Sequence, residues 1–215
     1  MNFFSTYNPP STNLHIIYAD DSLLVVNKPE GLLAVPGRGP EKQDSLISRL
    51  LIDFPDALVV HRLDMSTSGI MLFARGDRMQ RQLSKLFSER NIAKCYVAVV
   101  EGKLEPEIGE VNLPIAADWG NRPLRKVDPA SGRHSLTRFR RIDFIDGNSR
   151  VELKPVTGRT HQLRLHMSAI GHPILGDALY GKTSNATRLM LHASSLEFVH
   201  PFSGQFMCFN CTSVF

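Results

Sequence analysis

The order of apolar and polar positions predicts a chain that is built mainly of short strands. Two apolar, β-branched runs at 14–18 and 23–27 flank a polar turn at 19–22, which is typical of a β-hairpin. Other short apolar runs predict strands at 58–60, 69–74, 95–100, 150–153, 189–192, 196–199 and 205–209.

Apolar residues at helical spacing predict three helices between these strands. We expect Asp44 to cap a helix with apolar positions 46, 47, 50 and 51, and Asp77 to cap one with apolar positions 79, 83, 86 and 87. A third helix over 161–170 is predicted to end at Gly171. Because strands and helices do not alternate regularly, the pattern predicts an α+β fold with mixed, largely antiparallel sheets flanked by a few helices.

Composition predicts a folded protein whose cysteines are reduced. The chain has 215 residues with 42% hydrophobic and 21% charged residues, so we expect a loose arm over 1–13 and one domain over 14–215. Three cysteines cannot form a disulfide framework, and no apolar run is long enough to span a bilayer. We therefore expect a cytoplasmic protein without membrane association. Residues 101–135 are rich in Gly, Pro and Asp, which indicates a functional loop or an internal boundary.

The strongest chemical signal lies at 61–69, where His-Arg-Leu-Asp-Met-Ser-Thr-Ser-Gly separates two predicted strands. Loops between strands can expose a reactive side chain and still hold it in place. Asp64 beside Arg62 fits a catalytic carboxylate with a basic neighbour for a phosphate or a base. The alternative is a surface charge pair on a turn.

A second signal lies at 158–166, with the sequence Gly-Arg-Thr-His-Gln-Leu-Arg-Leu-His. On the predicted helix His161 and Leu165 are four residues apart, as are Gln162 and His166, and Arg164 belongs to neither of these pairs. If Arg164 is buried it needs a carboxylate partner from elsewhere in the chain, and Asp64 is a candidate. The alternative is an ordinary amphipathic helix with solvated basic residues.

Two cofactor patterns can be weighed and set aside. His161 and His166 are five residues apart rather than four, and Cys208 and Cys211 have no second pair at zinc-finger spacing. Residues 176–183 match the phosphate-binding pattern GxxxxGK[ST], but Asp177 in the spacer would repel a phosphate. The sequence therefore predicts no metal and no cofactor.

Basic residues are concentrated in one segment of a nearly balanced chain, whose net charge is +4. Between 122 and 141 the only acid is Asp128, and the basic residues are Arg122, Arg125, Lys126, Arg133, Arg138, Arg140 and Arg141. Arginine suits bidentate phosphate contacts and stacking on bases. We predict an RNA-binding surface here, with Arg122, Arg125 and Lys126 as its contacts; the alternative is a solvated basic hairpin.

Several blocks in a fixed order resemble the RluA family of RNA pseudouridine synthases. The 61–64 block, followed by Ser-Gly at 68–69, resembles the family's catalytic motif. The other matching blocks lie at 27–33, 94–98, 158–166, 171–177 and 189–193. Together they extend over nearly the whole chain, and they account for 176–181 as a family feature rather than a nucleotide-binding loop.

The resemblance implies the isomerisation of uridine in RNA, in a cleft at the centre of the fold and without a cofactor. Asp64 would be the essential carboxylate, acting as a nucleophile or as a base, and Arg164 would keep it ionised. Tyr96 would stack on the uracil, and its hydroxyl could handle the proton at C5. Arg62 would enter the space left by the flipped base or hold a flanking phosphate.

Features at 7–10, 54–57 and 118–123 are similar to one subgroup of the family, which also lacks an S4-like domain. This implies a monomer that modifies position 32 of the tRNA anticodon stem-loop and position 746 of 23S rRNA. The same chemistry on another uridine, or a non-catalytic RNA-binding module, is the alternative. A P-loop nucleotidase is a third hypothesis.

Overall fold

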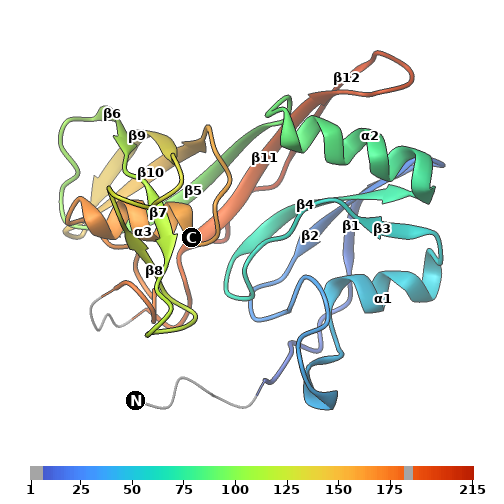
Figure 1. Cartoon of the computed structure of the whole chain (residues 1–215), viewed down its shortest axis with the longest axis horizontal. Coiled ribbons are helices and arrows are strands. Elements are labelled where there is room, and N and C mark those ends of the chain that lie inside the picture. Colours follow the sequence, from blue (N-terminus) through green and yellow to red (C-terminus); the bar gives the residue numbers. More distant parts are fainter. Residues whose placement is uncertain (1–6, 182–185) are drawn as a thin grey trace. The chain divides into compact units, whose positions relative to one another are not determined.

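A computed structural model describes residues 7–181 and 186–215, which form two compact units (Figure 1). Unit 1 comprises Met1–Ile92 and Leu196–Cys211, and unit 2 comprises Ala93–Ser195 and Thr212–Phe215. The single domain expected over 14–215 therefore stays a prediction, and each unit is described by itself.

Unit 1 is a mainly antiparallel sheet with helices. Its elements are β1 (His15–Ala19), β2 (Leu23–Lys28), a 3-10 helix (Pro40–Lys42), α1 (Leu46–Asp53), β3 (Ala57–Val59), β4 (Ser68–Arg75), α2 (Gly76–Ser88), β12 (Phe206–Asn210) and the second half of β11 (Leu191–Val199). β1, β2, β4 and β11 are neighbours in that order, while β3 pairs with β4 and β12 with β11. The predicted hairpin at 14–27 is confirmed, because β1 and β2 pair in antiparallel register.

The central strands of unit 1 are buried on both faces, which explains their continuous apolar sequence. Leu72 on β4 packs in one cluster with Met79 and Leu83 of α2, whereas the neighbouring Met71 and Phe73 must point to the opposite face. Figure 1 shows α1 and α2 on opposite sides of β2 and β4. Full burial of each such side chain contributes roughly 1.5–3 kcal/mol.

Both predicted helix caps of unit 1 are wrong. The cap of α1 is Ser45, whose hydroxyl accepts the Ser48 N–H at 3.3 Å while the Ser48 hydroxyl accepts the Ser45 N–H at 2.8 Å. Asp44 instead forms a bidentate pair with Arg49. Asp77 lies inside the first turn of α2, where its charge still favours the helix dipole.

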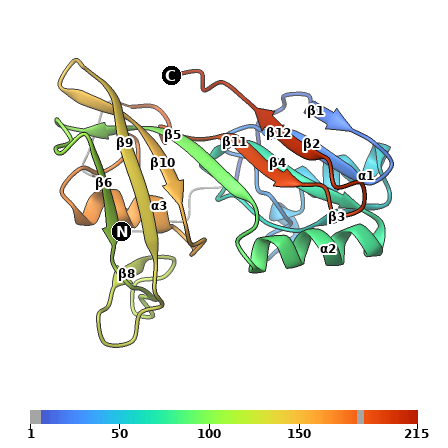
Figure 2. The same cartoon turned by 90° about the horizontal axis from the view of Figure 1, so that it is seen from above.

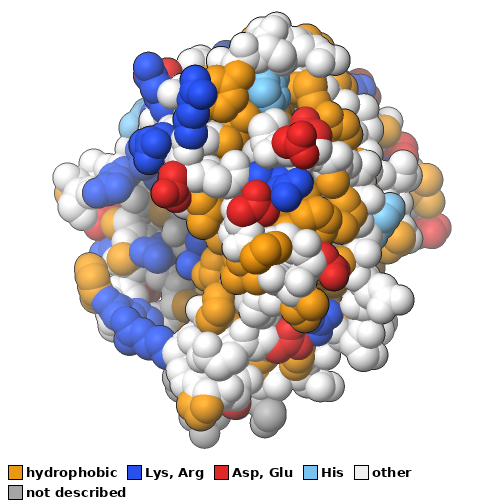
Figure 3. All heavy atoms as spheres, turned by 90° about the vertical axis from the view of Figure 1, so that its right-hand side faces the viewer, with side chains coloured by type: hydrophobic (Ala, Val, Ile, Leu, Met, Phe, Trp, Pro, Cys, Tyr) orange, Lys and Arg blue, Asp and Glu red, His pale blue; other side chains and the backbone are white. Residues whose placement is uncertain are grey.

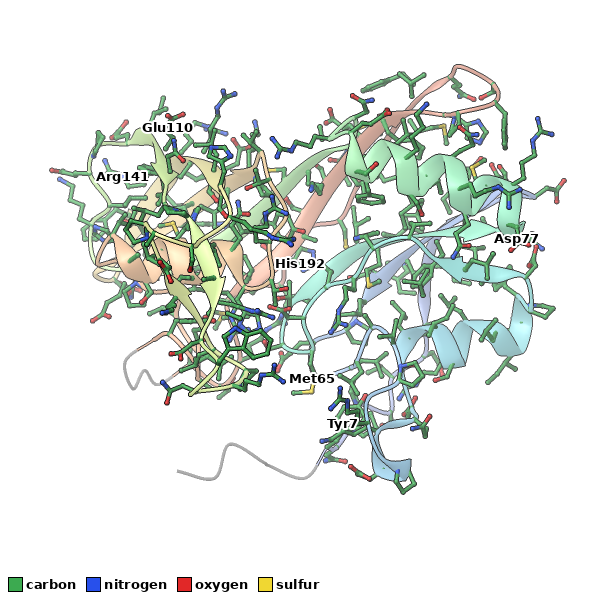
Figure 4. The ribbon with its side chains drawn as sticks, viewed as in Figure 1. Tyr7, Met65, Asp77, Glu110, Arg141 and His192 are labelled. Carbon is green, nitrogen blue, oxygen red and sulfur yellow. The ribbon has the colours of Figure 1, made fainter. Side chains whose placement is uncertain are left out.

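The described part of the N-terminal arm is held against unit 1. Tyr7, which is labelled in Figure 4, donates its hydroxyl to the Asp44 carbonyl at 2.9 Å and accepts the Leu33 N–H at 3.0 Å. Arg49 also donates to the Pro10 carbonyl at 2.8 Å. Residues 7–12 are therefore less loose than we expected, and residues 1–6 lie outside the described part.

Unit 2 is an antiparallel sheet with a buried helix and a separate hairpin. Its elements are β5 (Ala93–Glu101), β6 (Ile108–Asn112), β7 (Ile115–Ala117), β8 (Arg125–Val127), β9 (Leu136–Ile145), β10 (Asn148–Pro155), α3 (Gln162–Ala169) and the first half of β11. The sheet order is β5, β10, β9, β6, and β7 pairs only with β8 among the described strands. Figure 2 shows β9 and β10 running side by side.

Helix α3 lies against this sheet and is buried around most of its circumference. Leu163 and Met167 pack with Val151 and Leu153 of β10. Residues 162–167 are all buried, so the alternative of an amphipathic helix with solvated basic residues is wrong. The predicted end at Gly171 is correct to within one residue: α3 ends at Ala169, Ile170 is its C-cap, and Gly171 follows with φ +87°, where a glycine is least strained.

The predicted fold class is confirmed, but three segments differ from the prediction. Residues 101–135 contain β6, β7 and β8. The runs predicted at 189–192 and 196–199 are joined in one strand, β11, which begins only at Leu191. Strand β9 is missing from the prediction because its solvent-facing positions carry arginines, which interrupt the apolar pattern that a strand usually shows.

Candidate active site

Asp64 lies in the loop between β3 and β4 of unit 1, where a tight turn presents it. The Thr67 N–H donates to the Asp64 carbonyl at 3.1 Å and closes this turn. Leu63 is buried beside it, while Arg62 and Met65 are exposed and Asp64 is half-buried. Figure 4 labels Met65 at this turn. The loop thus combines an accessible carboxylate with a buried residue on its N-terminal side.

A buried lysine binds this loop through its backbone. The Lys28 side chain is 0% exposed, and its ammonium group donates to the carbonyls of Pro29, Leu32 and Met65 at 2.8, 2.7 and 3.0 Å. An ammonium group has three donors, so three carbonyls compensate for its removal from water. The Gly31 N–H also donates to the Met65 carbonyl, at 2.9 Å. The segment after β2 and the Asp64 loop are therefore joined at one point.

His61 holds the other end of the loop. Its Nε2 accepts the Leu72 N–H at 2.9 Å, and its ring stacks on Phe87 of α2 with 4.5 Å between the centroids. Because Nε2 accepts a hydrogen bond, it carries no proton in this arrangement. Residues 61–67 are therefore fixed to β4 and α2 at the start and to Lys28 after Asp64.

The two other predicted catalytic residues lie in unit 2. Tyr96 is half-buried on β5, opposite Leu153 of β10, and packs against the core of the unit. Arg164 on α3 is only 5% exposed, and it donates from Nε and Nη2 to the two oxygens of Asp177 at 2.8 and 2.6 Å. Arg164 thus has the carboxylate partner that burial requires. Its predicted pairing with Asp64 stays a prediction.

Asp177 also organises the segment that follows it. Its Oδ1 accepts the N–H groups of Leu179 and Tyr180 at 2.9 and 3.2 Å, and its carbonyl accepts the Gly181 N–H at 2.9 Å. These are the backbone donors that a phosphate-binding loop would have to offer to its ligand. The structure therefore argues against a nucleotide site at 176–181, and the Lys and Thr at 182 and 183 lie outside the described residues.

Tyr180 connects three features of unit 2. Its hydroxyl lies 2.7 Å from His161 Nδ1 and accepts the Arg125 N–H at 2.8 Å. The Arg164 guanidinium lies over its ring, 5.4 Å from the centroid. One side chain therefore contacts the β7–β8 hairpin, the residue before α3 and the arginine on α3.

Strand pairing divides the basic segment into two parts. On β9, Arg138 pairs with Glu110 at 3.9 Å, Arg140 with Glu152 at 3.3 Å, and Arg141 with Glu107, and these acids come from outside the segment. Figure 4 labels Glu110 and Arg141. Burial raises the pKa of Glu152, but hydrogen bonds from Lys154 and Arg140 outweigh it, so the pKa lies below its usual value. The β9 arginines are thus largely balanced by acids on β6, on β10 and just before β6.

The predicted RNA-binding residues belong to the other part, the β7–β8 hairpin. The guanidinium of Arg122 lies 4.1 Å from the centroid of the Trp119 ring. The Lys126 ammonium lies 3.4 Å from an Asp128 oxygen, and Asp128 also binds Ser131. Nε of Arg125 is buried without a hydrogen-bond partner. Arg122 and Lys126 are consequently the more accessible cations of the three.

The histidines and cysteines of the zinc hypothesis have other surroundings. His166 is buried between the Thr137 hydroxyl and the Leu113 carbonyl, each at 2.9 Å. Burial lowers its pKa, and the hydrogen bond to Leu113 offsets this in part. Cys208 and Cys211 are not joined by a disulfide. Residues 7–181 and 186–215 contain no group of three His, Cys, Asp or Glu that could hold a metal ion.

Acidic and hydrophobic side chains are interspersed over the centre of the face that Figure 3 draws. No helix within the described residues is long and apolar enough to cross a membrane.

Sequence reasoning missed the supporting roles of Lys28, His61, Asp177 and Tyr180. Lys28 and Asp177 each stand inside a block that carried the family resemblance. A charged residue beside an apolar strand, such as Lys28 at the end of β2, was the available signal, because burial of a charge requires specific partners. The partners themselves lie too far along the chain for local patterns to predict.

Comparisons with known proteins agree with these features. A family model described as RNA pseudouridylate synthase matches residues 22–169. The chain is 49% identical over 214 residues to the dual-specificity RNA pseudouridine synthase RluA of Haemophilus influenzae, covering 97% of this chain and 98% of that protein. The protein of the same description from Escherichia coli (strain K12) is 47% identical, with the same coverage.

Two solved human structures are also similar. Human RNA Pseudouridylate Synthase Domain Containing 1 has a TM-score of 0.78 and 30% identity, covering 99% of this chain and 86% of that chain. For Human RNA Pseudouridylate Synthase Domain Containing 4 the TM-score is 0.75 at 26% identity, covering 92% and 88%.

Proposed function

Because the chain belongs to the RNA pseudouridylate synthase family and is therefore an isomerase acting on RNA, we propose that it has two specific substrates. These are uridine at position 32 of the tRNA anticodon stem-loop and uridine at position 746 of 23S rRNA. Support comes from the similarity to two relatives described as dual-specificity enzymes, which extends over almost the full length of each. Both proposed sites are loops, in which a base can be extruded at low cost.

The reaction needs no external reagent. The bond between N1 of uracil and C1′ of ribose breaks, a bond between C5 and C1′ forms, the proton on C5 leaves, and N1 gains a proton. Atoms and electrons balance without an oxidant, a reductant or a group donor. Side chains that bind the base, stabilise charge and move one proton are therefore sufficient.

The observation that carries the proposed mechanism is the fixed but accessible loop around Asp64. With Lys28 and His61 holding its two ends, the carboxylate is positioned before the substrate arrives, which lowers the entropic cost of reaching the transition state. Asp64 acts on the ribose or the base as a nucleophile, or removes a proton from the sugar. Arg62 is exposed two residues earlier and occupies the space that the flipped base leaves.

Tyr96 and Arg164 complete the proposed catalytic set. Tyr96 is half-buried on β5, so its ring can stack on the uracil, and its hydroxyl can take part in the proton transfer from C5. Arg164 stabilises the ionised form of Asp64. Its buried bidentate pair with Asp177 holds the guanidinium in one orientation for this task.

Tritium release from RNA labelled at C5 of uridine tests the function directly. We expect release from a tRNA anticodon stem-loop and from the corresponding 23S rRNA loop, and no release after Asp64→Asn, although RNA binding persists. Asp77→Asn is the matched control, because Asp77 is an exposed aspartate on α2 and its loss should leave the rate unchanged. Wild-type activity in Asp64→Asn would overturn the assignment.

The same assay separates the alternatives. A non-catalytic module would bind the RNA without releasing tritium, and a nucleotidase would hydrolyse ATP in the presence of magnesium. Release from only one of the two RNAs would reject the dual specificity and keep the enzymatic class. We further propose that the chain is cytoplasmic and acts as a monomer. Sedimentation of the full chain with and without RNA tests the monomeric state.

A further inference from the structure

The tip of the β7–β8 hairpin displays a large aromatic side chain that the catalytic scheme does not use. Trp119 is 71% exposed, although burial of apolar surface stabilises proteins by roughly 25 cal/mol per Å². It is also the only tryptophan in the sequence. A side chain of this size at a loop tip, beside several cations, is typical of a binding residue rather than a structural one.

The loop that carries Trp119 is an ordered platform. The Asp118 N–H donates to the Leu124 carbonyl at 3.1 Å, and the Leu124 N–H donates to the Asn121 carbonyl at 2.9 Å. The Asn121 side chain donates to an Asp118 oxygen at 3.0 Å. The hairpin is in turn held at the strand position next to this loop, where the Arg125 N–H donates to Tyr180. An ordered aromatic loses little conformational entropy when a ligand stacks on it.

Charge and stacking at the tip point to one class of ligand. The Arg122 guanidinium lies 4.1 Å from the centroid of the Trp119 ring, which leaves most of the indole accessible. Residues 118–126 contain three cationic side chains and one carboxylate, and the carboxylate of Asp118 is already bound to Asn121. An aromatic ring stacked with an arginine in a positive loop matches the π-face and the phosphate of an unpaired nucleotide.

We propose that Trp119, supported by Arg122, is a stacking platform for an unpaired base of the RNA substrate, outside the uridine that reacts. This rests on the proposed function and adds a binding residue to it. The platform selects RNA loops over duplexes, because only a loop offers an unstacked base. It contributes affinity that does not depend on phosphate contacts, whereas the neighbouring cations supply the salt-dependent part.

The single tryptophan allows a direct test by fluorescence. Titration of the full chain with a synthetic tRNA anticodon stem-loop should change the emission of Trp119 as the complex forms. The same RNA with abasic sugars at every loop position except the target uridine should bind without that change. Complete binding of the intact loop, measured by filter retention, with unchanged emission would overturn the proposal.

Kinetics supply a second test. Trp119→Ala should raise KM for the stem-loop about 5- to 100-fold with kcat nearly unchanged, and by the same factor at low and high salt. Trp119→Phe should restore most of the affinity because it retains an aromatic face. Phe206→Ala is the matched control, since Phe206 is a comparably exposed aromatic on β12 of unit 1, and its KM should equal that of the wild type.

A KM of Trp119→Ala within twofold of the wild type would also overturn the platform. Tritium release measured in the same samples distinguishes a failure of the stacking proposal from a failure of the proposed function. A wild-type protein that releases tritium while Trp119→Ala retains normal KM rejects the platform alone. A wild-type protein that releases none from any RNA rejects the proposed function.

Discussion

Replacing Asp177 with asparagine removes the charge that faces Arg164 and keeps the shape of the side chain. Arg164 is 5% exposed and Asp177 3%, and two hydrogen bonds of 2.6 and 2.8 Å join them. The loss of one member of such a buried pair costs about 3–5 kcal/mol, because the remaining charge stays out of water. The asparagine oxygen can still accept the backbone N–H groups of 179 and 180, so the cost arises mainly from the charge.

Urea unfolding and thermal unfolding, both followed by circular dichroism, measure this loss as a free energy of unfolding and as a Tm. For a chain of about 200 residues, 1 kcal/mol corresponds to a shift of about 2–4 °C in Tm, so Asp177→Asn should lower Tm by about 6–20 °C. Glu110→Gln is the matched control, with the same carboxylate-to-amide change at an exposed pair whose atoms lie 3.9 Å apart. It should cost less than about 1 kcal/mol.

A double-mutant cycle distinguishes the pair from a general loss of packing. Arg164→Gln alone should also cost about 3–5 kcal/mol, whereas the double variant with Asp177→Asn should cost at least about 2 kcal/mol less than the sum of the two, because no charge is left uncompensated. Additive effects, or a loss below about 1 kcal/mol in Asp177→Asn, would refute the argument that the ion pair holds this region.

Three further predictions concern the site and its surroundings. Lys28→Met should lower the free energy of unfolding by at least about 2 kcal/mol and lower kcat, because three carbonyls lose their donor. Wild-type values in both urea unfolding and tritium release would contradict the role of Lys28 in holding the Asp64 loop. Burial lowers the pKa of His166 from 6.5, so the unfolded chain binds the proton more readily. The contribution of this group to the free energy of unfolding is therefore complete above pH 6.5 and decreases as the pH falls toward the folded-state pKa. Urea midpoints measured at several pH values should decrease less steeply toward low pH in His166→Gln than in the wild type. Arg125→Glu with Lys126→Glu should raise the dissociation constant for RNA and flatten its salt dependence, and an unchanged constant at low and high salt would identify a solvated surface.

The sequence predicted what is encoded locally. The β1–β2 hairpin and the loop around Asp64 each occupy a short stretch in which apolar runs and turn residues adjoin. The end of α3 followed from Gly171 alone. By contrast, Lys28 and the Met65 carbonyl that it binds are 37 residues apart, and Arg164 and Asp177 are 13 residues apart. No periodicity joins such positions, so these partners became visible only in the folded chain.

Cap prediction failed for a related reason, since a side chain can cap a helix only if the preceding backbone presents it. Asp44 and Ser45 are both good capping residues by type. Ser48 decides between them, because its hydroxyl returns a hydrogen bond to the Ser45 N–H, and Asp44 is then available for Arg49. When two neighbouring residues could both cap a helix, the choice between them therefore depends on the side chains in the first turn of that helix.

The basic segment shows how strand pairing changes the meaning of a charge pattern. In the sequence, seven cations stand against one acid between 122 and 141, and all seven would count toward an RNA surface. In the sheet, the arginines of β9 face glutamates supplied by β6, β10 and the turn before β6, so their field is reduced at short range. On the hairpin, Lys126 likewise has an Asp128 oxygen at 3.4 Å, whereas Arg122 lies over the Trp119 ring and keeps more of its field. An approaching phosphate is therefore attracted more strongly to Arg122, beside Trp119, than to any one of the paired arginines on β9.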